Sequence, residues 1–542
     1  MISVIEALHH IAKKFPEVVG LKIPQNHWWH KSFYKTKTFR QMDHSADLWA
    51  TYLFTKGFTK GEKALVMVPP GEDLLMAVFA MLRLGVVPVI IDPGMGIKNF
   101  INCAKKTKPN LFLGCPKAKV LYYILRPFIK FKAGIFLTKA LKKRIDSTDF
   151  ACHMQPEMNL QSTAAVLFTS GSTGYPKGAM YSYADFTAQI EALRTTFDIH
   201  PGEVDLPLLP VFSLYNPALG MTTVVPEMNP AHPSTLNPKK ISEAILTHNV
   251  TNSFGSPRLW TKIVDYCEQN AITFPSIKRV FLAGAPVHPS LLNRLKKLLP
   301  NGEAFTPYGA TEALPITYTT SQEVLNETYK LTLKGYGTCV GTPLKQVEIR
   351  IIPIVEDRLS QLPEELPQGV VGEIAVYAPY ISKSYLNDPT ATAKAKIQQD
   401  GKIWHRMGDL GYKDAQGRLW FCGRKIERVE TPEKTFYTDC CEAIFNTHKD
   451  VFRSALIQFY TETHKIVPAI IIEPKQQISD KEILNVFQEL RALAQTTSAT
   501  QEIHHFGVFK KFPVDVRHNA KIHRLTLANY FQKHPKRIME IQ

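Results

Sequence analysis

A ten-residue loop, Thr169–Gly178, has the composition of a phosphate-binding site. It follows the apolar run Ala164–Phe168, which predicts a buried strand. Backbone N–H groups and hydroxyls of such a loop can turn toward a polyphosphate, and its lysine adds a positive charge. The spacing differs from a Walker A loop, because Pro176 rather than glycine precedes the lysine. A flexible surface turn is the alternative. The candidate phosphate-binding residues are Thr169, Ser170, Gly171, Ser172, Thr173, Gly174 and Lys177.

The same loop resembles the phosphate-binding loop of the adenylate-forming superfamily, which contains acyl-CoA synthetases, firefly luciferase and peptide-synthetase adenylation domains. The resemblance covers nearly the whole chain, and the expected motifs follow in order. It implies that a carboxylate attacks the α-phosphate of ATP and expels pyrophosphate, which gives an acyl-adenylate. ATP and Mg²⁺ are the implied cofactors.

Two further motifs resemble those that hold adenine and metal in this superfamily. Gly284, Ala285 and Pro286 follow an expected strand and resemble the adenine-binding loop. The second motif consists of Tyr308, Gly309, Ala310, Thr311 and Glu312. The resemblance implies that Thr311 contacts a phosphate oxygen and that Glu312 binds Mg²⁺, which prefers oxygen ligands. A turn followed by a capped helix is the alternative here, because Thr and Glu suit helix starts.

Three residues farther along match nucleotide-binding positions of the superfamily. Asp409 would bind the ribose hydroxyls, and an Asx turn beside two glycines is its alternative. Arg424 would hold ribose or phosphate, where an always-charged guanidinium fits. Lys521 matches the lysine that reaches the α-phosphate and the substrate carboxylate, with a solvated basic tail as the alternative. The implied catalytic residues are Lys177, Thr311, Glu312 and Lys521.

Several positions depart from the acyl-CoA synthetase pattern. Glu433 falls where those enzymes have a hinge glycine, and its side chain would obstruct the close approach that glycine permits. Asn519-Ala520 replaces the Ser-Gly before the catalytic lysine. Phe212 and Ser213 stand where the superfamily often has a histidine or an aromatic pair, so the role of that histidine is not carried over. These departures weaken the expectation of a CoA thiol as acceptor.

Four segments are instead similar to the β-lactone synthetases of bacterial long-chain olefin biosynthesis: 204–207, 216–220, 306–312 and 513–521. This narrower resemblance implies adenylation of a long-chain 3-hydroxy fatty acid. The acid's own hydroxyl then displaces AMP in an intramolecular step, and a decarboxylase would turn the lactone into an alkene.

Two alternatives to lactone synthesis stay open at this point. A fatty acyl-CoA or acyl-carrier ligase is the first. A non-catalytic nucleotide-binding or assembly protein is the second, and the presence of all expected charged residues argues against it. The absence of a Gly-x-Ser-x-Gly nucleophile elbow argues against a hydrolase.

Alternating strands and helices position these motifs. Strands at 63–68 and 86–91 flank a helix at 73–84, and this order predicts a βαβ unit with a parallel sheet. We expect an α/β fold whose large N-terminal domain, 1–423, combines parallel-sheet subdomains with a β-rich subdomain. By resemblance, a hinge joins it to a small, mobile α+β lid domain at 424–542.

Size and cysteine usage set the broad class. A chain of 542 residues exceeds a single core, and 44% apolar residues suit globular packing. Eight cysteines without a Cys-x-x-Cys pair fit a reducing cytoplasm. The start, 1–10, predicts an amphipathic helix rather than a signal peptide. We therefore expect a cytoplasmic enzyme, and a peripheral position at the inner membrane stays open.

The net charge of +17 has no accompanying nucleic-acid-binding motif, so nucleic acid is not an expected partner. Basic clusters between Lys117 and Lys143 alternate with Leu, Tyr, Ile and Phe. This stretch fits either an anionic membrane surface or helices with an ordinary core face. A basic surface with scattered apolar residues is also compatible with an olefin-pathway multienzyme complex.

Overall fold

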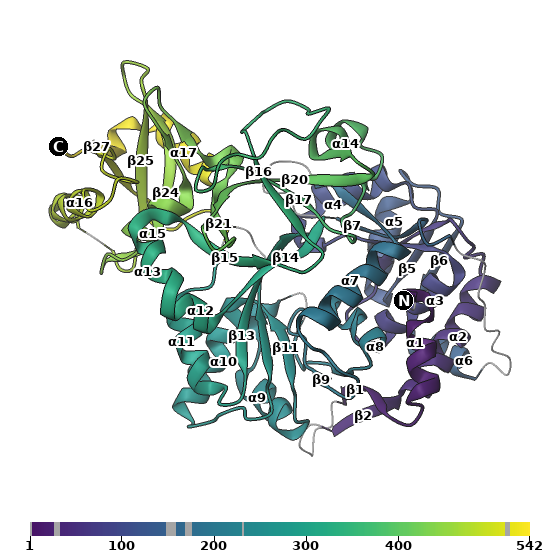
Figure 1. The fold of residues 1–542 in the computed structure, drawn as a ribbon. Coiled ribbons are helices and arrows are strands. Elements are labelled where there is room, and N and C mark those ends of the chain that lie inside the picture. Colours follow the sequence, from purple (N-terminus) through teal and green to yellow (C-terminus); the bar gives the residue numbers. More distant parts are fainter. Residues whose placement is uncertain are drawn as a thin grey trace.

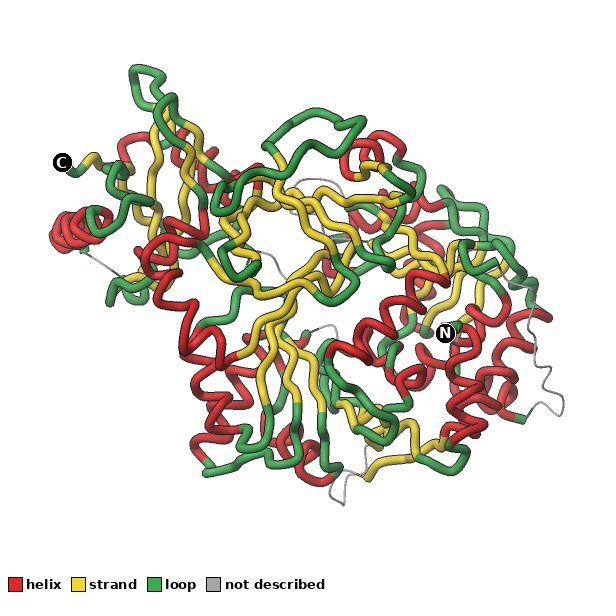
Figure 2. The backbone as a smooth tube through the Cα atoms, in the orientation of Figure 1, coloured by secondary structure: helices red, strands yellow, loops and turns green. Residues whose placement is uncertain are grey.

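The computed structural model describes residues 3–25, 33–147, 159–168, 176–229, 232–477, 479–514 and 521–542. Figure 1 shows a large N-terminal part and a small C-terminal domain at its upper left, where the chain ends. Figure 2 shows strands running through the middle of each part, with helices packed outside them. This arrangement confirms the expected α/β class.

Among the described residues the first sheet has seven strands, and Lys177 directly precedes one of them. Five successive strands, from β7 to the edge strand β6, are parallel, while β8 pairs antiparallel with β7 and β18 pairs antiparallel with β8. The order is β18 (Ser384–Tyr385), β8 (Gly178–Ser182), β7 (Thr163–Phe168), β4 (Val87–Ile90), β3 (Lys63–Met67), β5 (Leu111–Gly114) and β6 (Ala133–Phe136). The expected βαβ unit is confirmed, because α3 (Glu72–Leu84) connects the parallel strands β3 and β4.

Helices cover both faces of this sheet, as a parallel sheet requires. Successive residues of β3 enter different cores, because side chains alternate along a strand. Ala64 and Val66 pack with α3, while Leu65 packs with Phe100 and Leu125 on the other face. The covering helices are α1 (Val4–Lys14), α2 (Phe39–Thr55) and α3 on one side, and α4 (Ile97–Thr107) and α5 (Lys119–Leu125) on the other. The amphipathic helix expected at the N-terminus is α1.

The second sheet has a parallel half that supplies the adenine-side loops. Its strands are β13 (Glu303–Ala310), β12 (Arg279–Leu282), β11 (Asn252–Gly255), β9 (Val204–Asp205), β10 (Thr222–Val224) and β1 (Val19–Gln25), with antiparallel β2 (Phe33–Thr38) at the edge. One face packs on α9 (Pro238–Thr247), α10 (Pro257–Gln269) and α11 (Pro289–Leu298). The other face meets α7 (Tyr183–Thr196) and α8 (Asn216–Leu219).

The same sheet continues into an antiparallel, β-rich half. Its strands are β14 (Ala313–Thr320), β15 (Thr338–Pro343), β21 (Leu419–Arg424), β20 (Lys402–Lys413), β17 (Gly372–Tyr377), β16 (Glu348–Ile352) and β19 (Lys396–Gln399). Because β13 and β14 pair directly, residues 306–312 form a strand and a tight turn. The alternative of a capped helix for this segment is therefore wrong. One helical stretch, 321–336, completes this half together with α14 (Pro389–Ala395); in that stretch α12 (Ser321–Glu323) and α13 (Tyr329–Leu331) alternate with π-helical turns.

The C-terminal domain follows β21, which ends at Arg424. A short helical turn, η7 (Lys425–Glu427), leads into the hairpin β22 (Val429–Glu430) and β23 (Thr435–Phe436). The domain sheet contains β24 (Val451–Tyr460), β25 (Ile466–Pro474), β26 (His505–Val508) and β27 (Ile538–Glu540). Its helices are α15 (Thr438–Phe445), α16 (Asp480–Ala494) and α17 (Arg524–Lys533). β25, α16 and β26 form the expected βαβ element, because β25 and β26 are parallel.

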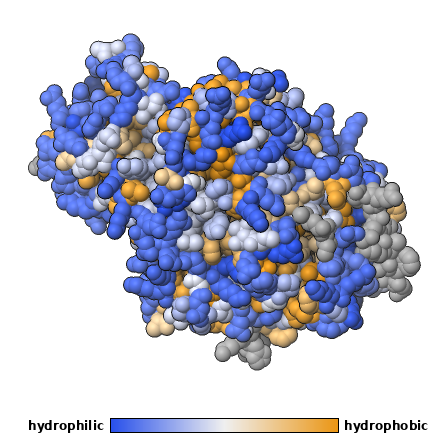
Figure 3. Space-filling model, in the orientation of Figure 1, coloured by the Kyte–Doolittle hydropathy of each residue, from blue (hydrophilic) through white to orange (hydrophobic). Residues whose placement is uncertain are grey.

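The surface in this view is mostly polar over the C-terminal domain (Figure 3), and apolar side chains gather over the β-rich half beside it. Within the described ranges, the structure contains no helix with the length and apolar character needed to span a bilayer.

Candidate active site

One cavity of about 3070 Å³ brings most of the predicted site residues together. It lies where both large sheets meet the C-terminal domain, so its walls come from segments more than 300 residues apart. The predicted residues that line it are Lys177, Gly284, Ala285, Pro286, Tyr308, Gly309, Ala310, Thr311, Glu312, Asp409, Arg424 and Lys521. Thr169, Ser170, Gly171, Ser172, Thr173 and Gly174 lie outside the described residues.

Glu312 occupies the turn between β13 and β14, and its carboxylate is buried. Tyr385 donates its hydroxyl to Glu312 Oε1 at 2.7 Å. The pairing of β18 with β8 places Tyr385 opposite Ala179, two residues after Lys177. The Lys177 ammonium consequently lies 5.2 Å from the centre of the Tyr385 ring. Lys177 and Glu312, expected from the sequence to meet phosphate and metal, thus share one tyrosine.

Asp409 lies on β20 directly opposite Arg424 on β21. The two form an ion pair at 2.7 Å, and Tyr308 donates its hydroxyl to Asp409 Oδ2 at 2.6 Å. Burial raises the pKa of the Asp409 carboxyl, although the charges of Arg424 and Lys521 oppose this rise. A carboxylate has about four acceptor positions, so Asp409 can accept ribose hydroxyls beside these partners.

The adenine-side loop and the Thr-Glu turn have backbones that suit close contact with a ligand. Gly284 has φ +89°, a left-handed conformation that glycine adopts without strain. A Cβ on Gly309 would lie only 2.4 Å from the carbonyl oxygen of Ala313 across the turn. Tyr181 donates its hydroxyl to the carbonyl of Thr311, which leaves the Thr311 side chain exposed to the cavity.

The C-terminal domain reaches the cavity through Lys521, whose charge acts on Asp409. Three residues later Arg524, at the start of α17, is held by two carboxylates. It contacts Glu427 at 2.8 Å and Glu442 at 2.6 Å. These ion pairs join α17 to the segment after β21 and to α15, so they hold Lys521 on the cavity side of the domain.

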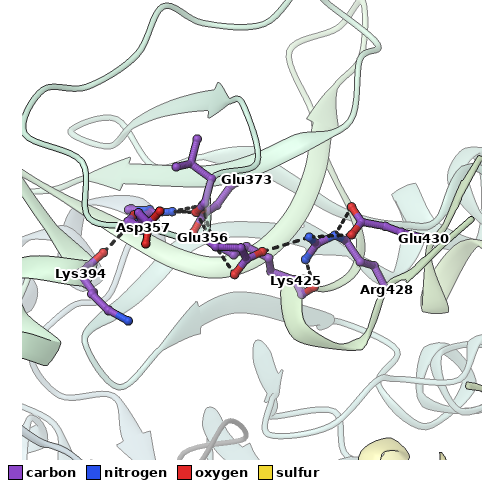
Figure 4. Close-up of polar contacts among 9 residues, drawn as sticks. Glu356, Asp357, Glu373, Lys394, Lys425, Arg428 and Glu430 are labelled. Carbon is purple, nitrogen blue, oxygen red and sulfur yellow. Dashed lines mark hydrogen bonds and ion pairs between the residues drawn. The ribbon is translucent and has the colours of Figure 1, made fainter. Parts of the chain in front are cut away.

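A second network fixes the segment that joins the two domains (Figure 4). Lys425 lies 3.2 Å from Glu373 on β17 and donates to the carbonyl of Val355 at 2.6 Å. Arg428 contacts Glu356 at 3.0 Å and Glu430 at 2.8 Å. Because Glu356 and Glu373 precede β21, these contacts tie the C-terminal domain to the β-rich half of the second sheet, in the orientation in which Lys521 and Asp409 line one cavity.

An apolar pocket adjoins the charged groups. Phe212 stacks on Phe254 with ring centres 4.0 Å apart, and both rings line the cavity. Phe212 therefore has a place in the pocket wall in addition to packing. One polar pair lies in this region, because the hydroxyl of Tyr215 donates to Gln189 Oε1 at 2.6 Å.

Sequence reasoning missed two residues near Glu312. Tyr385 lies 73 positions away in the chain and belongs to no motif. Lys396 is buried on β19, opposite His405 on β20, with its ammonium 6.0 Å from the Tyr385 ring. Burial lowers the pKa of Lys396 to about 7, and the charges of Glu312 and Asp185 oppose that shift. Lys394 and Gln398, its neighbours at alternate positions, are polar as well, so no local sequence pattern marks Lys396.

The residues that depart from the acyl-CoA synthetase pattern are only partly described. Glu433 lies in the turn between β22 and β23, where its side chain is exposed and does not line the cavity. Its obstruction of a thiol therefore stays a prediction. Asn519 and Ala520 lie outside the described residues.

Comparisons with known proteins agree with this geometry. Residues 10–386 match the family of AMP-binding enzymes. A protein of Stenotrophomonas maltophilia named olefin beta-lactone synthetase is 38% identical over 543 residues, which cover 96% of each chain. A protein of the same name from Xanthomonas campestris is 36% identical over 546 residues, which cover 97% of each chain.

The fold is also that of a solved structure, the O-succinylbenzoate coenzyme A synthetase of Bacillus subtilis in complex with ATP and a magnesium ion. The TM-score is 0.76 at 21% identity, and the match covers 96% of this chain and 99% of that one. The family match, the near-full-length relatives and the ordered motifs agree, so this chain belongs to the AMP-binding, adenylate-forming enzymes.

Proposed function

We propose that this protein converts a long-chain 3-hydroxy fatty acid into a β-lactone, with ATP cleaved to AMP and pyrophosphate. The observation that carries the proposal is near-full-length similarity to two olefin beta-lactone synthetases. A cavity that joins anion-binding groups to an apolar pocket supports it. The relatives' name supplies the product class, and the positions of the cavity residues support the roles proposed for them below.

The described residues fit ATP and Mg²⁺. When bound, ATP supplies a phosphorus for the carboxylate to attack and a pyrophosphate leaving group, and Mg²⁺ neutralises part of its charge. Glu312 would bind the metal with the hard oxygen it prefers, since Tyr385 uses only one bond of that carboxylate. Asp409 would hold the ribose, and Arg424 the ribose or a phosphate. Gly284, Ala285 and Pro286 would border the adenine.

Two lysines approach the reacting groups from different domains. Lys177 from the first sheet would contact the outer phosphates, and Lys521 from the lid would contact the α-phosphate and the substrate carboxylate. Both partners in this step are anions that repel each other in water. Fixed positive charges in a partly closed site lower that repulsion, and they are worth more there than in bulk solvent.

Ring closure follows within the same activated molecule. The oxygen of the 3-hydroxyl bonds to the acyl carbon, the bond from that carbon to the AMP oxygen breaks, and the hydroxyl proton is lost. The nucleophile is already attached to the acyl group, so the step has the entropic advantage of an intramolecular reaction. No second substrate needs to enter the site.

Tyr215 and Gln189 would recognise the 3-hydroxyl. They are the polar pair among the aromatic residues of the pocket, and Gln189 is fixed by donating to the carbonyl of Leu314 at 2.5 Å. The Tyr215 oxygen still has lone pairs and Gln189 Nε2 a second N–H, so both can bond the substrate hydroxyl, and an acid without that hydroxyl loses these bonds.

The proposal is tested by AMP and pyrophosphate release without CoA, using a long-chain 3-hydroxy acid and the matching acid without the hydroxyl. We expect sustained turnover with the hydroxy acid alone. Tyr215→Phe should reduce its kcat/KM by about tenfold or more while changing pyrophosphate exchange with the plain acid much less. Turnover that requires CoA and accepts both acids equally would instead indicate an acyl-CoA ligase.

A further inference from the structure

The segment between Asp92 and Asp146 is strongly basic. It contains thirteen Lys or Arg residues and no Asp or Glu. The net charge of the whole chain is +17, so this tenth of the sequence holds much of the excess. The question left by the sequence is whether the apolar residues between these charges face a core or the surface.

The structure shows that they do both. Leu125 and Ile129 pack under α5 against the first sheet, as an ordinary core face would. On the outer side, the exposed fractions are 68% for Val120, 53% for Tyr123 and 56% for Phe128. α5 therefore presents an apolar outer face after its core contacts are made. In Figure 1, α4 and α5 lie far from the C-terminal domain.

Basic side chains surround this outer face. The Lys105 ammonium on α4 lies 3.6 Å from the centre of the Phe128 ring, so the two helices present one joint surface. The ion pairs of this segment among described residues involve Lys106, Lys132 and Lys142. Nine exposed basic residues of this segment have no ion pair with any described residue, among them these six: Lys98, Lys105, Lys117, Lys119, Arg126 and Lys130. We call these six with Val120, Tyr123 and Phe128 the α4–α5 surface.

This surface borders the active-site cavity. Lys117, in the turn before α5, and Leu121, within α5, line the same cavity as Lys177. An amphiphile held at the outer face of α5 would thus need to travel only along the cavity wall to reach the charged groups. That position matters for a substrate whose long chain dissolves poorly in water.

We infer that the α4–α5 surface binds an anionic lipid bilayer. Exposed aromatic and aliphatic side chains can enter the headgroup region, while uniformly positive surroundings are attracted to anionic headgroups. A charged protein partner would be expected to meet carboxylates as well as cations, and the segment from 93 to 145 has none. The occupant inferred here is therefore lipid, which also supplies the long-chain acid of the proposed function. Binding itself does not depend on that function.

The test is co-sedimentation of the full-length protein with vesicles of phosphatidylglycerol and phosphatidylcholine, against vesicles of phosphatidylcholine alone. We expect binding to the anionic vesicles only, with a decrease as salt is raised. Tyr123→Ser with Phe128→Ser, and separately Lys105→Glu with Arg126→Glu and Lys130→Glu, should each weaken binding by about tenfold or more.

The control variants carry an equal number of serine or glutamate substitutions at exposed apolar or basic residues on other faces of the protein. They are Leu246→Ser with Met539→Ser, and Lys239→Glu with Lys296→Glu and Lys297→Glu, all at exposed positions. These controls should bind vesicles as the wild type does. Thermal melting and turnover of a short, water-soluble 3-hydroxy acid should stay unchanged in every variant, which separates loss of binding from loss of folding or of the proposed activity.

Three outcomes would overturn the inference. The first is that the wild-type protein does not bind anionic vesicles. The second is that the control variants lose as much vesicle binding as the α4–α5 variants. The third is that the α4–α5 surface binds an acidic protein and does not bind lipid. If vesicle binding occurs as expected but no lactone forms, the proposed function fails and the inference about the surface stands.

Discussion

At the scale of single residues, the site depends on side chains that fix one another before any ligand arrives. Tyr385 holds Glu312 through a hydrogen bond and lies beneath Lys177. Asp409 is held by both Tyr308 and Arg424. Such mutual contacts pre-organise the charged groups, which is how an enzyme stabilises a highly charged transition state without reorganising during the reaction.

Glu312→Gln should lower pyrophosphate release by about a hundredfold or more, because it removes the charge that is proposed to bind the metal. The neutral amide can still accept the hydrogen bond from Tyr385, so folding should be retained. Pyrophosphate release across a Mg²⁺ titration measures the effect. Wild-type turnover in this variant would show that Glu312 does not bind the metal.

Lys521→Ala should reduce adenylation by a similar factor of about a hundred or more, because it removes the cation that is proposed to contact the α-phosphate. Lys511→Ala is the control, since Lys511 is an exposed lysine in the same domain outside the cavity. Exchange of labelled pyrophosphate into ATP measures the step directly. If both variants exchange at the wild-type rate, Lys521 is part of a solvated tail.

At the scale of elements, a buried carboxyl group on the short strand β9 should make the stability of the protein depend on pH. Asp205 on β9 is buried and accepts a hydrogen bond from Asn216 at 2.8 Å. Burial raises the pKa of Asp205 to about 7, and the bond from Asn216 opposes the rise only in part. The folded carboxyl thus keeps its proton at pH values where an unfolded one, with a pKa near 3.9, has lost it.

This difference predicts a specific dependence of stability on pH. The contribution of Asp205 to the free energy of unfolding is most favourable below pH about 4. It decreases by about 4 kcal/mol in total as the pH rises to about 7, and it is constant above that pH. Asp205→Asn, whose amide oxygen can still accept from Asn216, should remove this dependence and raise stability at pH 7.5. Unfolding free energies of both proteins at several pH values measure it. A constant difference between them would contradict the prediction.

The end of β21, where the chain passes into the C-terminal domain, is a second place where a single residue should affect stability. Gly423 has φ +138°, and a Cβ there would lie 2.2 Å from Thr438 Oγ1 at the start of α15. Gly423→Ala should therefore destabilise the contact between β21 and α15 by about 1–3 kcal/mol. Gly417→Ala is the control, because Gly417 also has a positive φ but nothing within 4 Å of its Cβ position. Proteolysis at the joining segment and thermal melting should both distinguish the two variants, and equal behaviour would contradict the steric argument.

Helices and strands could be predicted from the sequence where a local pattern marks them, whereas contacts between side chains far apart in the chain could not. The strand expected at 63–68 is β3, and the helix expected at 73–84 is α3, because apolar runs and a terminal glycine mark their ends. The bond between Tyr385 and Glu312 left no such signal, since pairing of β18 with β8 creates it. Asp409 and Arg424 could be named from motifs, but their placement on opposite strands required the fold.

At the scale of the whole molecule, the domain orientation has functional meaning. Lys425 and Arg428 contact Glu373 and Glu356 of the N-terminal domain. Arg524 fixes α17 within the C-terminal domain, so that Lys521 lines the cavity. An enzyme whose nucleophile is part of its own substrate does not need a second domain arrangement to admit a thiol. The observed orientation of the C-terminal domain is therefore consistent with the proposed lactone formation.

The most direct test of lactone formation is the identification of the product by mass spectrometry after incubation with ATP, Mg²⁺ and a synthetic long-chain 3-hydroxy acid, without CoA. We predict a β-lactone with the mass of the acid less one water, formed in equal amount to AMP. Release of AMP with only the unchanged acid recovered, or a product that forms only when CoA is added, would contradict the account.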